Sequence, residues 1–440
     1  MPLFARKSSP PPEPVAVPRV ALPEPPAPNA DGLRSMEDHR DYLLSCVAEM
    51  PAFRQQILDT VGLSISEDVV AGIDLPGFDN SAMDGYAVYA DDVEDASAEQ
   101  PVSLPVVGEV AAGQSARHRL SPGTAMKIMT GAPIPPGADA IVPYENSNRG
   151  TDDVLVHAPS LDGQHIRRHG EDVSAGSQVY TAGDVLGARD VGLLAALGLD
   201  TVLVRPRPRV VVISTGSELV EPGQPLNHEE QIYDSNSYLL AAAAREAGAQ
   251  VYRVGFVGDD PDQVRQLIAD QLVRADLILT TGGVSQGDYD IVKAVMPELG
   301  DTDFARVAMQ PGKPQGFGLI GEHGVPMIML PGNPVSAFVS FEAFVRPAIR
   351  KLMGTRPYVR TTERGQALHA ISSAPGRKQF ARGIVSRGAD GTRQVELAGG
   401  HGSHLMGDLA RANALVVLGE GTDFVASGDD VDVWLLGDEQ

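Results

Sequence analysis

The sequence predicts a multidomain α/β protein in which a central, doubly wound α/β domain is flanked by smaller β domains and a helical linker. Three observations support this prediction. The chain has 440 residues, more than one hydrophobic core usually holds, so several domains are expected. Between residues 207 and 354, apolar runs alternate with helical patterns, which is typical of a parallel sheet covered on both faces. On either side, short alternating strands are separated by glycine and proline turns, which indicates β structure.

The N-terminal segment, residues 1–33, contains ten prolines. Such a composition cannot bury a core, so we expect a disordered tail that either has no further role or serves as an arm for a partner. A helix should begin at Ser35, with Asp38 in the position of its capping partner. A second helix is expected at 53–61, ending at Gly62.

These two helices and a third at 186–200 are predicted to form a helical linker domain, made of residues 34–72 and 173–206. A β domain at 73–172 is inserted between the two parts of the linker. Its expected strands are 102–107, 125–129, 140–144 and 153–156.

The inserted β domain contains the most polar loop of the chain. Residues 76–88 place two carboxylates, an amide and a hydroxyl beside two glycines. Asp, Asn and Ser favour turns because their side chains bond to nearby backbone groups. We expect Asp79 and Asp84 to be free to face a site; the alternative is a surface turn with solvated acids.

The central domain, 207–354, is predicted to alternate buried strands with helices. The strands are 210–213, 251–257, 277–280 and 327–330, and the helices are 236–247, 262–273, 291–296 and 335–353. Ligands of such sheets bind at the carboxyl ends of the strands. From 355 to 440 a β-barrel-like domain is expected, with strands at 394–397, 414–418 and 431–436.

Three loops at the carboxyl ends of the predicted strands carry candidate binding groups: 214–218, 281–290 and 331–336. The second and third are rich in glycine and enter helix N-termini, where free amides and the helix dipole attract anions. Glu218, Asp288 and Asp290 bring negative charge to the same edge, which is unfavourable beside a phosphate unless a cation such as Mg²⁺ bridges them. The sequence therefore predicts a phosphorylated ligand together with a divalent cation.

The charge of the chain restricts its partners. The formal net charge is −23, which argues against nucleic acid or an anionic membrane as the main target. No apolar run reaches the length of a membrane span, and no signal peptide is recognisable, so a cytoplasmic protein without direct membrane insertion is expected.

Arg306 and Lys313 are the local cations expected to neutralise phosphate. The charged run 165–172 either contributes to the site or is a solvated face.

Several segments resemble the MoeA family of molybdopterin molybdenumtransferases and the homologous E domain of gephyrin. The resemblance runs from about Ser35 to the C-terminus. The matching segments are PGFDNSAMDGYAV (76–88), KIMTGAPIPPGADAIVPYE (127–145), IRRHGEDV (166–173), STGSEL (214–219), IYDSNS (232–237), VGDDP (257–261), TTGGVSQGDYD (280–290), QPGKPQGFG (310–318) and LPGNPVSA (330–337).

The resemblance implies a function and an assembly. Members of the family insert molybdate into adenylylated molybdopterin with Mg²⁺, releasing AMP and forming molybdenum cofactor. The domain at 207–354 would bind the molybdopterin, and the protein would be an elongated homodimer whose site lies between domains of two subunits. A single-domain adenylyltransferase family shares the sheet and the GG loop but lacks the flanking β domains.

The motifs and the resemblance together give three sets of site residues. The predicted catalytic set is Asp84, Thr130, Arg167, Asp172, Glu218, Asp290, Lys313, Arg382 and Ser403. The predicted cofactor-binding set is Ser214, Thr215, Gly216, Gly282, Gly283, Ser285, Asp288, Arg306, Pro331, Gly332, Asn333, Pro334 and Ser336. The predicted Mg²⁺ ligands are Glu218, Asp259 and Asp290.

Two positions depart from the family pattern. Arg306 and Gln310 stand where many enzymatic members carry lysine. Arg306 keeps the charge, but Gln310 removes a cation from a site for polyanions, which would weaken substrate binding by about 1–3 kcal/mol.

The resemblance to gephyrin implies an alternative function. The protein would be a dimeric scaffold that binds linear peptides of cytoskeletal proteins, for example of cell division, or of membrane receptors, with or without enzyme activity. The groove would lie between the C-terminal β domain and the sheet domain of the dimer mate, near residues 320–355 and 410–440. Gln310 and the proline-rich arm motivate this alternative.

Overall fold

The computed structural model describes residues 20–113, 118–258, 260–283 and 291–437. The chain forms two compact units, each described here by itself. The first contains residues up to Phe53, the short stretch Gly62–Ser64, and everything from Arg205 onward. The second contains Arg54–Val61 and Ile65–Val204. The finer five-part division predicted from the sequence stays a prediction.

The first unit is built on a six-stranded sheet with the order β16-β13-β17-β21-β20-β18. Its strands are β13 (Arg209–Thr215), β16 (Gln250–Val257), β17 (Leu277–Thr281), β18 (Gly300–Arg306), β20 (Pro314–Ile320) and β21 (Val325–Leu330). The four predicted strands are present and parallel. Two further strands extend this parallel sheet at one edge, where β20 runs antiparallel to β21 and β18 antiparallel to β20. The short turn between β20 and β21 can join only antiparallel neighbours.

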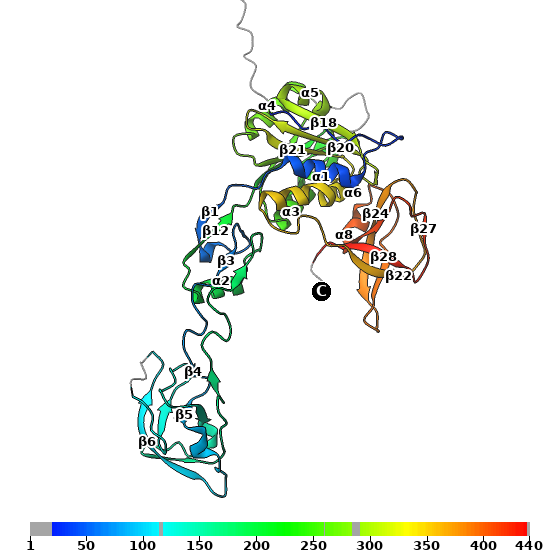
Figure 1. Ribbon diagram of the computed structural model, residues 1–440. Coiled ribbons are helices and arrows are strands. Elements are labelled where there is room, and N and C mark those ends of the chain that lie inside the picture. Colours follow the sequence, from blue (N-terminus) through cyan, green and yellow to red (C-terminus); the bar gives the residue numbers. More distant parts are fainter. Residues whose placement is uncertain (1–19, 114–117, 259, 284–290, 438–440) are drawn as a thin grey trace, which may run out of the picture. The chain divides into compact units, whose positions relative to one another are not determined.

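Helices cover both faces of this sheet, which confirms the doubly wound architecture (Figure 1). Val211 and Ile213 pack against helices on one face, whereas Val210 and Val212 pack against helices on the other. Side chains of a strand alternate between faces, so one apolar run supplies both cores. The first face carries α4 (Pro261–Gln271) and α5 (Ile291–Leu299), and the second carries α1 (Met36–Cys46), α3 (Asn236–Glu246), α6 (Pro334–Ser340) and α7 (Arg346–Leu352).

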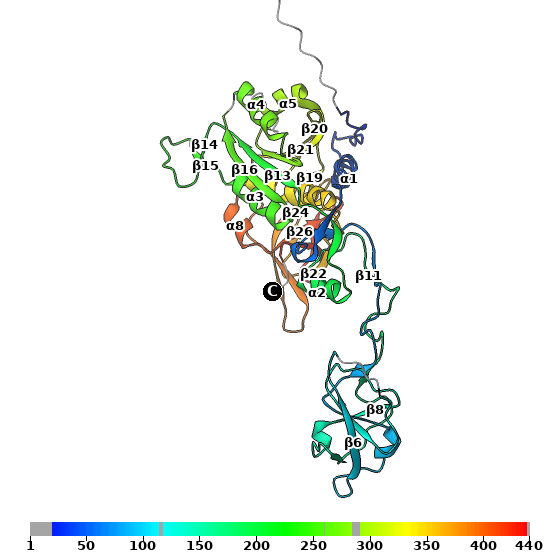
Figure 2. The same ribbon diagram turned by 90° about the vertical axis from the view of Figure 1, so that its left-hand side faces the viewer.

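The helix predicted at 335–353 is interrupted. A π-helical turn, η4 (Phe341–Val345), separates α6 from α7. The small β14 (Leu219–Val220) and β15 (Ile232–Tyr233) pair with each other and extend from the β16 edge of the sheet (Figure 2).

The N-terminal part of the first unit confirms one expectation and contradicts another. The Ser35 hydroxyl accepts a hydrogen bond from the Asp38 amide at 3.0 Å and caps α1, as predicted. Residues 1–19 of the predicted disordered tail lie outside the described residues. Residues 20–33 are not disordered, because the Arg34 Nε donates to the Pro26 carbonyl and the Tyr42 hydroxyl to the Pro23 carbonyl. Backbone carbonyls of this proline-rich stretch find partners on the folded unit.

The C-terminal part of the first unit is a closed β-barrel. Its ring consists of β22 (Glu363–Ala367), β24 (Lys378–Arg387), β25 (Arg393–Leu397), β26 (Ala414–Leu418) and β28 (Asp430–Leu435). β24 pairs with both β25 and β26, which closes the ring. β19 (Met309–Gln310) from the sheet domain also pairs with β24. Smaller elements are β23 (Ile371–Ser372), β27 (Phe424–Val425) and α8 (Met406–Arg411).

The second unit contains the inserted β domain, a five-stranded sheet of order β8-β5-β7-β6-β9. Its strands are β5 (Gly85–Val88), β6 (Val102–Val110), β7 (Ala125–Ile128), β8 (Ala140–Pro143) and β9 (Asp153–Val156). Tyr86 and Val88 are fully buried in its core. The two short strands β4 (Asn80–Ser81) and β10 (Ile166–Arg167) pair beside it.

The linker differs from the prediction in one element. α2 (Ala188–Ala196) forms where a helix was expected, but residues 53–61 are not a helix. They form β1 (Phe53–Gln56), which pairs with β12 (Thr201–Arg205), and the 3₁₀ turn η1 (Ile57–Asp59). Most side chains of β1 are exposed, so this stretch has no apolar face that would hold a helix against a core. The remaining short elements are β2 (Ser64–Ile65), β3 (Val69–Val70), β11 (Gln178–Tyr180), η2 (Ala90–Val93) and η3 (Tyr144–Asn146).

Within the part of the chain that the structure describes, no helix combines the length and apolar character needed to span a membrane.

Candidate functional site

The carboxyl ends of β13, β17 and β21 meet, as the sequence predicted for its three loops. The Thr281 hydroxyl donates to the Pro331 carbonyl at 3.1 Å, and the Gly282 amide donates to the Leu330 carbonyl at 3.2 Å. A Cβ atom on Gly282 would lie 2.8 Å from the Thr215 carbonyl oxygen, and the φ of Gly282 is +89°. Only glycine satisfies both conditions. The predicted residues Thr215, Gly282 and Pro331 are therefore in one place.

Asn236, at the start of α3, connects two of these loops. Its Nδ2 donates to the Gly332 carbonyl at 2.6 Å and to the Thr281 hydroxyl at 3.0 Å. Its Oδ1 is buried and has no hydrogen-bond partner among the described residues. Asn236 lies in the matching segment 232–237 but belongs to none of the predicted site sets. Its position at a helix start, behind a strand end, was the signal available.

Asp234 is a second residue that the sequence reasoning missed. The residue is 1% exposed, and its carboxylate accepts hydrogen bonds from the Ser214 hydroxyl at 2.9 Å and from the Ser237 amide at 3.1 Å. Arg253 lies 3.8 Å away and compensates the buried charge. Because Ser214 gives its proton to Asp234, it anchors the end of β13 and does not point a free hydroxyl at a ligand.

Glu218 is the one predicted Mg²⁺ ligand among the described residues. It is exposed, and its two carboxylate oxygens lie 2.5 and 2.7 Å from where a Cβ of Gly216 would be. The carboxylate therefore folds over the glycine at the end of β13. The other predicted ligands, Asp259 and Asp290, lie outside the described residues, as do Ser285 and Asp288.

The described residues do not by themselves make up a metal centre. Over residues 20–113, 118–258, 260–283 and 291–437, no group of three or more His, Cys, Asp or Glu side chains is arranged to hold an ion. Asp234 is already bonded to serines, and the nearby Glu221 accepts from Arg253 and Tyr238. Glu218 is thus the described carboxylate at this edge that remains for a cation.

A loop of the barrel joins the third sheet loop. Asn333 and Pro334 begin α6, with no side-chain hydrogen bond from Asn333, and Ser336 is buried. The Val335 amide at this helix start donates to the Ser403 carbonyl at 3.0 Å. The predicted residues Pro334, Ser336 and Ser403 are therefore neighbours, although they come from different parts of the first unit.

Arg382 holds the same barrel loop in place. It is 5% exposed, its Nη1 donates to the Gly402 carbonyl at 2.9 Å, and its Nη2 donates to the Gly400 carbonyl. Its Nε is buried without a partner among the described residues. Burial lowers the pKa of this guanidinium. A buried cation with an unused donor is a group that an anion would stabilise.

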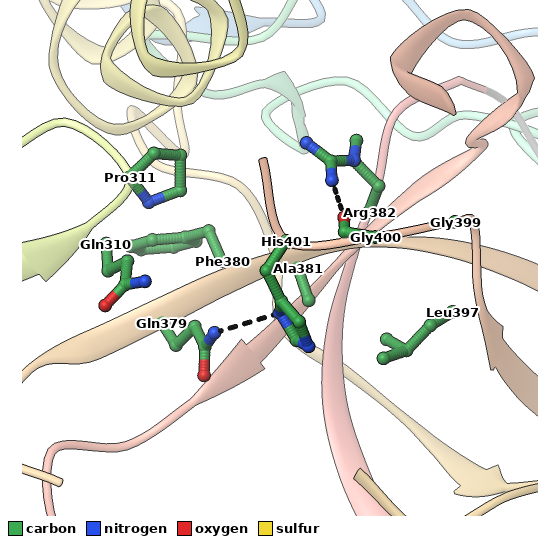
Figure 3. A pocket seen from close by; sticks show the side chains of 10 residues that line it. All are labelled: Gln310, Pro311, Gln379, Phe380, Ala381, Arg382, Leu397, Gly399, Gly400 and His401. Atoms are coloured by element: carbon green, nitrogen blue, oxygen red, sulfur yellow. Dashed lines mark hydrogen bonds between the residues drawn. The ribbon is translucent and has the colours of Figure 1, made fainter. Parts of the chain in front are cut away.

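A pocket lies beside Arg382 (Figure 3). Gln310 and Pro311 of the sheet domain form one part of its lining, and Gln379 and His401 of the barrel form another. The Gln379 amide nitrogen is 3.4 Å from the His401 Nδ1, while its Oε1 is buried and unpartnered within the described chain. The uncharged Gln310 thus lines the pocket beside Arg382, at the position where the sequence departs from the family.

Further cations lie near the turn between β19 and β20. Partial burial and repulsion from Arg306 and Arg377 lower the pKa of Lys313. Arg306 is exposed at the end of β18. The two cations expected to neutralise phosphate, Arg306 and Lys313, are therefore close enough to repel each other.

The second unit brings together another part of the predicted set. Asp84 Oδ1 accepts hydrogen bonds from both the amide and the hydroxyl of Thr130, each at 2.7 Å. These bonds hold the pKa of Asp84 below its usual value. Arg167 is exposed on β10, opposite Asn80 of the same polar loop. Asp172 is exposed, and its amide donates to the Leu75 carbonyl.

One expectation about this loop is wrong. Asp79 is not free to face a site, because its carboxylate accepts hydrogen bonds from the Arg168 guanidinium and the His169 amide, each at 2.8 Å. Asp79 therefore fixes the loop, whereas Asp84 remains exposed.

The comparisons with known proteins agree with this architecture. Residues 34–198 match the MoeA N-terminal region (domain I and II), residues 211–351 match a probable molybdopterin binding domain, and residues 364–436 match the MoeA C-terminal region (domain IV). The chain is 44% identical over 410 residues to "Molybdopterin molybdenumtransferase 2" of Mycobacterium tuberculosis (strain ATCC 25618 / H37Rv), covering 92% of this chain and 100% of the relative.

Two further relatives extend the comparison. "Molybdopterin molybdenumtransferase 1" of the same strain is 40% identical over 423 residues, covering 92% of this chain and 99% of the relative. The crystal structure of the molybdopterin biosynthesis moeA protein from Pyrococcus horikoshii OT3 superimposes with a TM-score of 0.75 at 30% identity, covering 92% of this chain and 100% of that chain.

Proposed function

The chain belongs to the MoeA family and is a molybdopterin molybdenumtransferase, and from this premise we propose how its own residues perform the transfer. The substrates are molybdopterin, in the adenylylated form, and molybdate, and the products are AMP and molybdenum cofactor. One observation carries the proposal: the sheet loops at Thr215, Gly282 and Pro331 pack together, and the barrel loop at Ser403 joins them.

The main physical difficulty of the reaction is that both substrates are anions. In our proposal, the pterin phosphates lie along the glycine loops, where backbone amides can approach closely. Molybdate lies in the pocket of Figure 3, next to the buried Arg382. Arg382, Lys313 and Arg306 offset the repulsion between the two anions, and positioning by the loops reduces the entropy lost when they meet.

The group Asp84, Thr130, Arg167 and Asp172 supplies the remaining functions. We assign Arg167 to charge compensation and Asp84 to orientation of the substrate, since Thr130 holds this carboxylate ionised and in one direction. This group lies in the second unit, and in our proposal a homodimer completes the site from two subunits, as the family resemblance implies.

Mg²⁺ is part of the proposal. Glu218 would contribute one carboxylate at the sheet edge, together with Asp259 and Asp290 from the sequence prediction. The cation would stabilise the charge that develops on the phosphoanhydride as it is cleaved. Preincubation with EDTA should abolish AMP release, and added Mg²⁺ should restore it; full activity after EDTA would contradict this assignment.

The experiment that tests the proposed site measures AMP release from adenylylated molybdopterin as a function of molybdate concentration. R382Q removes the buried cation and should raise the molybdate concentration needed for half-maximal rate by more than about tenfold. R364Q is a matched control, because Arg364 is an exposed barrel arginine paired with Asp432. Equal molybdate dependence in wild type, R364Q and a folded R382Q would remove Arg382 from the site.

Two statements about assembly stay proposals. Light scattering of the full chain should give a mass near twice 46.4 kDa if the homodimer forms. The peptide groove near 320–355 and 410–440 is tested by pull-down with the purified protein. Capture of cytoskeletal or receptor tails would support a scaffold role beside the enzyme activity, and capture of molybdenum-cofactor proteins alone would exclude it.

A further inference from the structure

We propose that a pocket between α7 and the barrel is a binding site for a phosphate-type oxyanion. Arg346 and Arg350 of α7 line it, together with Arg360 and its neighbours in 357–363 and with Leu435 of β28. We call it the arginine pocket. None of its lining residues belongs to the predicted catalytic, cofactor-binding or metal-binding sets, so the inference is independent of the proposed transferase site, although Arg346, Arg350 and Leu435 fall within the ranges given for the peptide groove.

The arginine pocket has more positive than negative charge. Glu342 lies behind it with its side chain 4% exposed, and Arg360 Nε donates to Glu342 Oε2. Arg346 Nε is 4.0 Å from the same oxygen. The carboxylate that lines the pocket, Glu363, accepts from Arg393 at 3.2 Å. Because Arg360 and Arg393 already serve these two carboxylates, Arg346 and Arg350 are in excess.

Arg346 and Arg350 keep N–H donors that a ligand could use. Arg350 Nε donates to the Pro357 carbonyl at 2.6 Å, which fixes the orientation of that guanidinium. Among the described residues, no hydrogen bond engages the terminal nitrogens of Arg346 or of Arg350. Guanidinium groups bind phosphate through paired, parallel N–H bonds. Two neighbouring guanidiniums with unused terminal donors are suited to one tetrahedral oxyanion.

The electrostatic environment of Arg346 and Arg350 also favours binding of an anion. Burial, followed by repulsion from Arg360, lowers the pKa of Arg346, although Glu342 and Glu246 partly oppose this effect. Burial and repulsion from Arg346 and Arg360 lower the pKa of Arg350. Cations that are partly removed from water beside other cations are unfavourable unless an anion joins them.

The backbone provides an independent observation. Glu342 belongs to the π-helical turn η4, and α7 with Arg346 and Arg350 begins directly after it. Such turns are rare and occur frequently at functional sites, because the inserted residue changes the direction of the side chains that follow. Here the turn lies where the helix supplies the buried carboxylate and the excess arginines.

Free phosphate and the phosphate group of a nucleotide would both bind to guanidinium groups in this way. Isothermal titration calorimetry on the full-length protein distinguishes these two kinds of ligand. The titrants are inorganic phosphate, pyrophosphate and AMP. R346Q and R350Q should each weaken binding of inorganic phosphate by about tenfold, with R364Q unchanged. R382Q, measured in parallel, should bind inorganic phosphate at the arginine pocket with the wild-type affinity. AMP is also a product at the proposed active site, so only AMP binding that R346Q and R350Q weaken is assigned to the arginine pocket. If such AMP binding is found and inorganic phosphate does not bind, the phosphate of a nucleotide is the ligand; the reverse result assigns the free ion.

Thermal melting of every variant shows whether it is folded, and a second measurement does not depend on the variants. Crystals of the wild-type protein soaked in selenate should show an anomalous peak between Arg346 and Arg350. No peak there, or phosphate affinity that is the same in folded R346Q, R350Q and wild type, would overturn the proposal.

Discussion

Asp84 and Thr130 form one hydrogen-bonded unit: a single carboxylate oxygen accepts both the amide and the hydroxyl of the threonine, each at 2.7 Å. The two residues are 46 positions apart in sequence. Both were predicted as catalytic, from separate segments, and the second unit brings them together. The amide and hydroxyl bonds stabilise the charged form of Asp84 and lower its pKa.

The first prediction concerns this pair. T130V keeps the amide bond and removes the hydroxyl bond, so the pKa of Asp84 should rise towards its ordinary value, as followed by carbon NMR of the carboxyl group. The rate of AMP release should fall between about tenfold and about a hundredfold, because the carboxylate is less firmly oriented. T124V is the control, since the Thr124 hydroxyl bonds only the nearby Ser121 carbonyl. An unchanged pKa in T130V would contradict the role of the hydroxyl.

The second prediction concerns Asn236. N236A removes the bonds to Gly332 and Thr281, so the two loops lose their connection and kcat/KM for the pterin substrate should fall about tenfold or more. Substrate titrations of AMP release check this result. N227A, at an exposed position in the same unit, should behave as wild type. If N236A lowers the melting temperature and leaves kcat/KM intact, the residue has a structural role only.

The third prediction concerns Gln310, which lines the pocket of Figure 3. Q310K adds a cation where the substrate is an oxyanion, and it should strengthen molybdate binding by about 1–3 kcal/mol. The molybdate concentration for half-maximal AMP release should therefore decrease. Q366K adds the same charge at an exposed position of the barrel. An equal response of Q310K and Q366K would show that only the net charge matters.

The fourth prediction concerns stability and pH. His39 is 1% exposed, its Nδ1 lies 3.1 Å from an Arg34 nitrogen, and burial followed by repulsion from Arg34 lowers its pKa to about 3. Arginine can only donate, so the ring accepts and is neutral in the folded protein. Below pH 6.5 the unfolded chain binds a proton that the folded chain does not bind. The contribution of His39 to the free energy of unfolding therefore decreases by about 1.4 kcal/mol per pH unit from about 6.5 down to about 3.

Urea unfolding at pH 7.5 and 5.5 measures this effect. H39N retains an acceptor for Arg34 and cannot titrate, so its loss of stability between the two pH values should be smaller than that of wild type. H323N changes an exposed histidine and should keep the wild-type difference. Equal pH dependence in wild type and H39N would show that His39 is protonated in the folded state.

The sequence predicted much of this architecture because the signals were local. The apolar runs at 210–213 and 277–280 became strands buried on both faces, and Ser35 capped the helix it was expected to cap. The failures have long-range causes. The first residues of the helix expected at 53–61 form strand β1 because β12, about 150 residues away, offers a partner, and residues 20–33 are ordered by contacts with the folded unit. Asp79 was expected to be free, but its partner Arg168 is 89 positions away.

The class of fold, the loops at the strand ends and the kinds of groups they carry follow from the amino-acid sequence alone, since periodicity and glycine placement are properties of short segments. Which polar groups already have hydrogen-bond partners, and which remain available to a ligand, depends on how the chain folds. Ser214 is bonded to Asp234, Asn236 spans two loops, and Arg346 is left in excess beside Glu342. Hydrogen bonding and charge balance depend on neighbours in space, and no spacing along the chain specifies them.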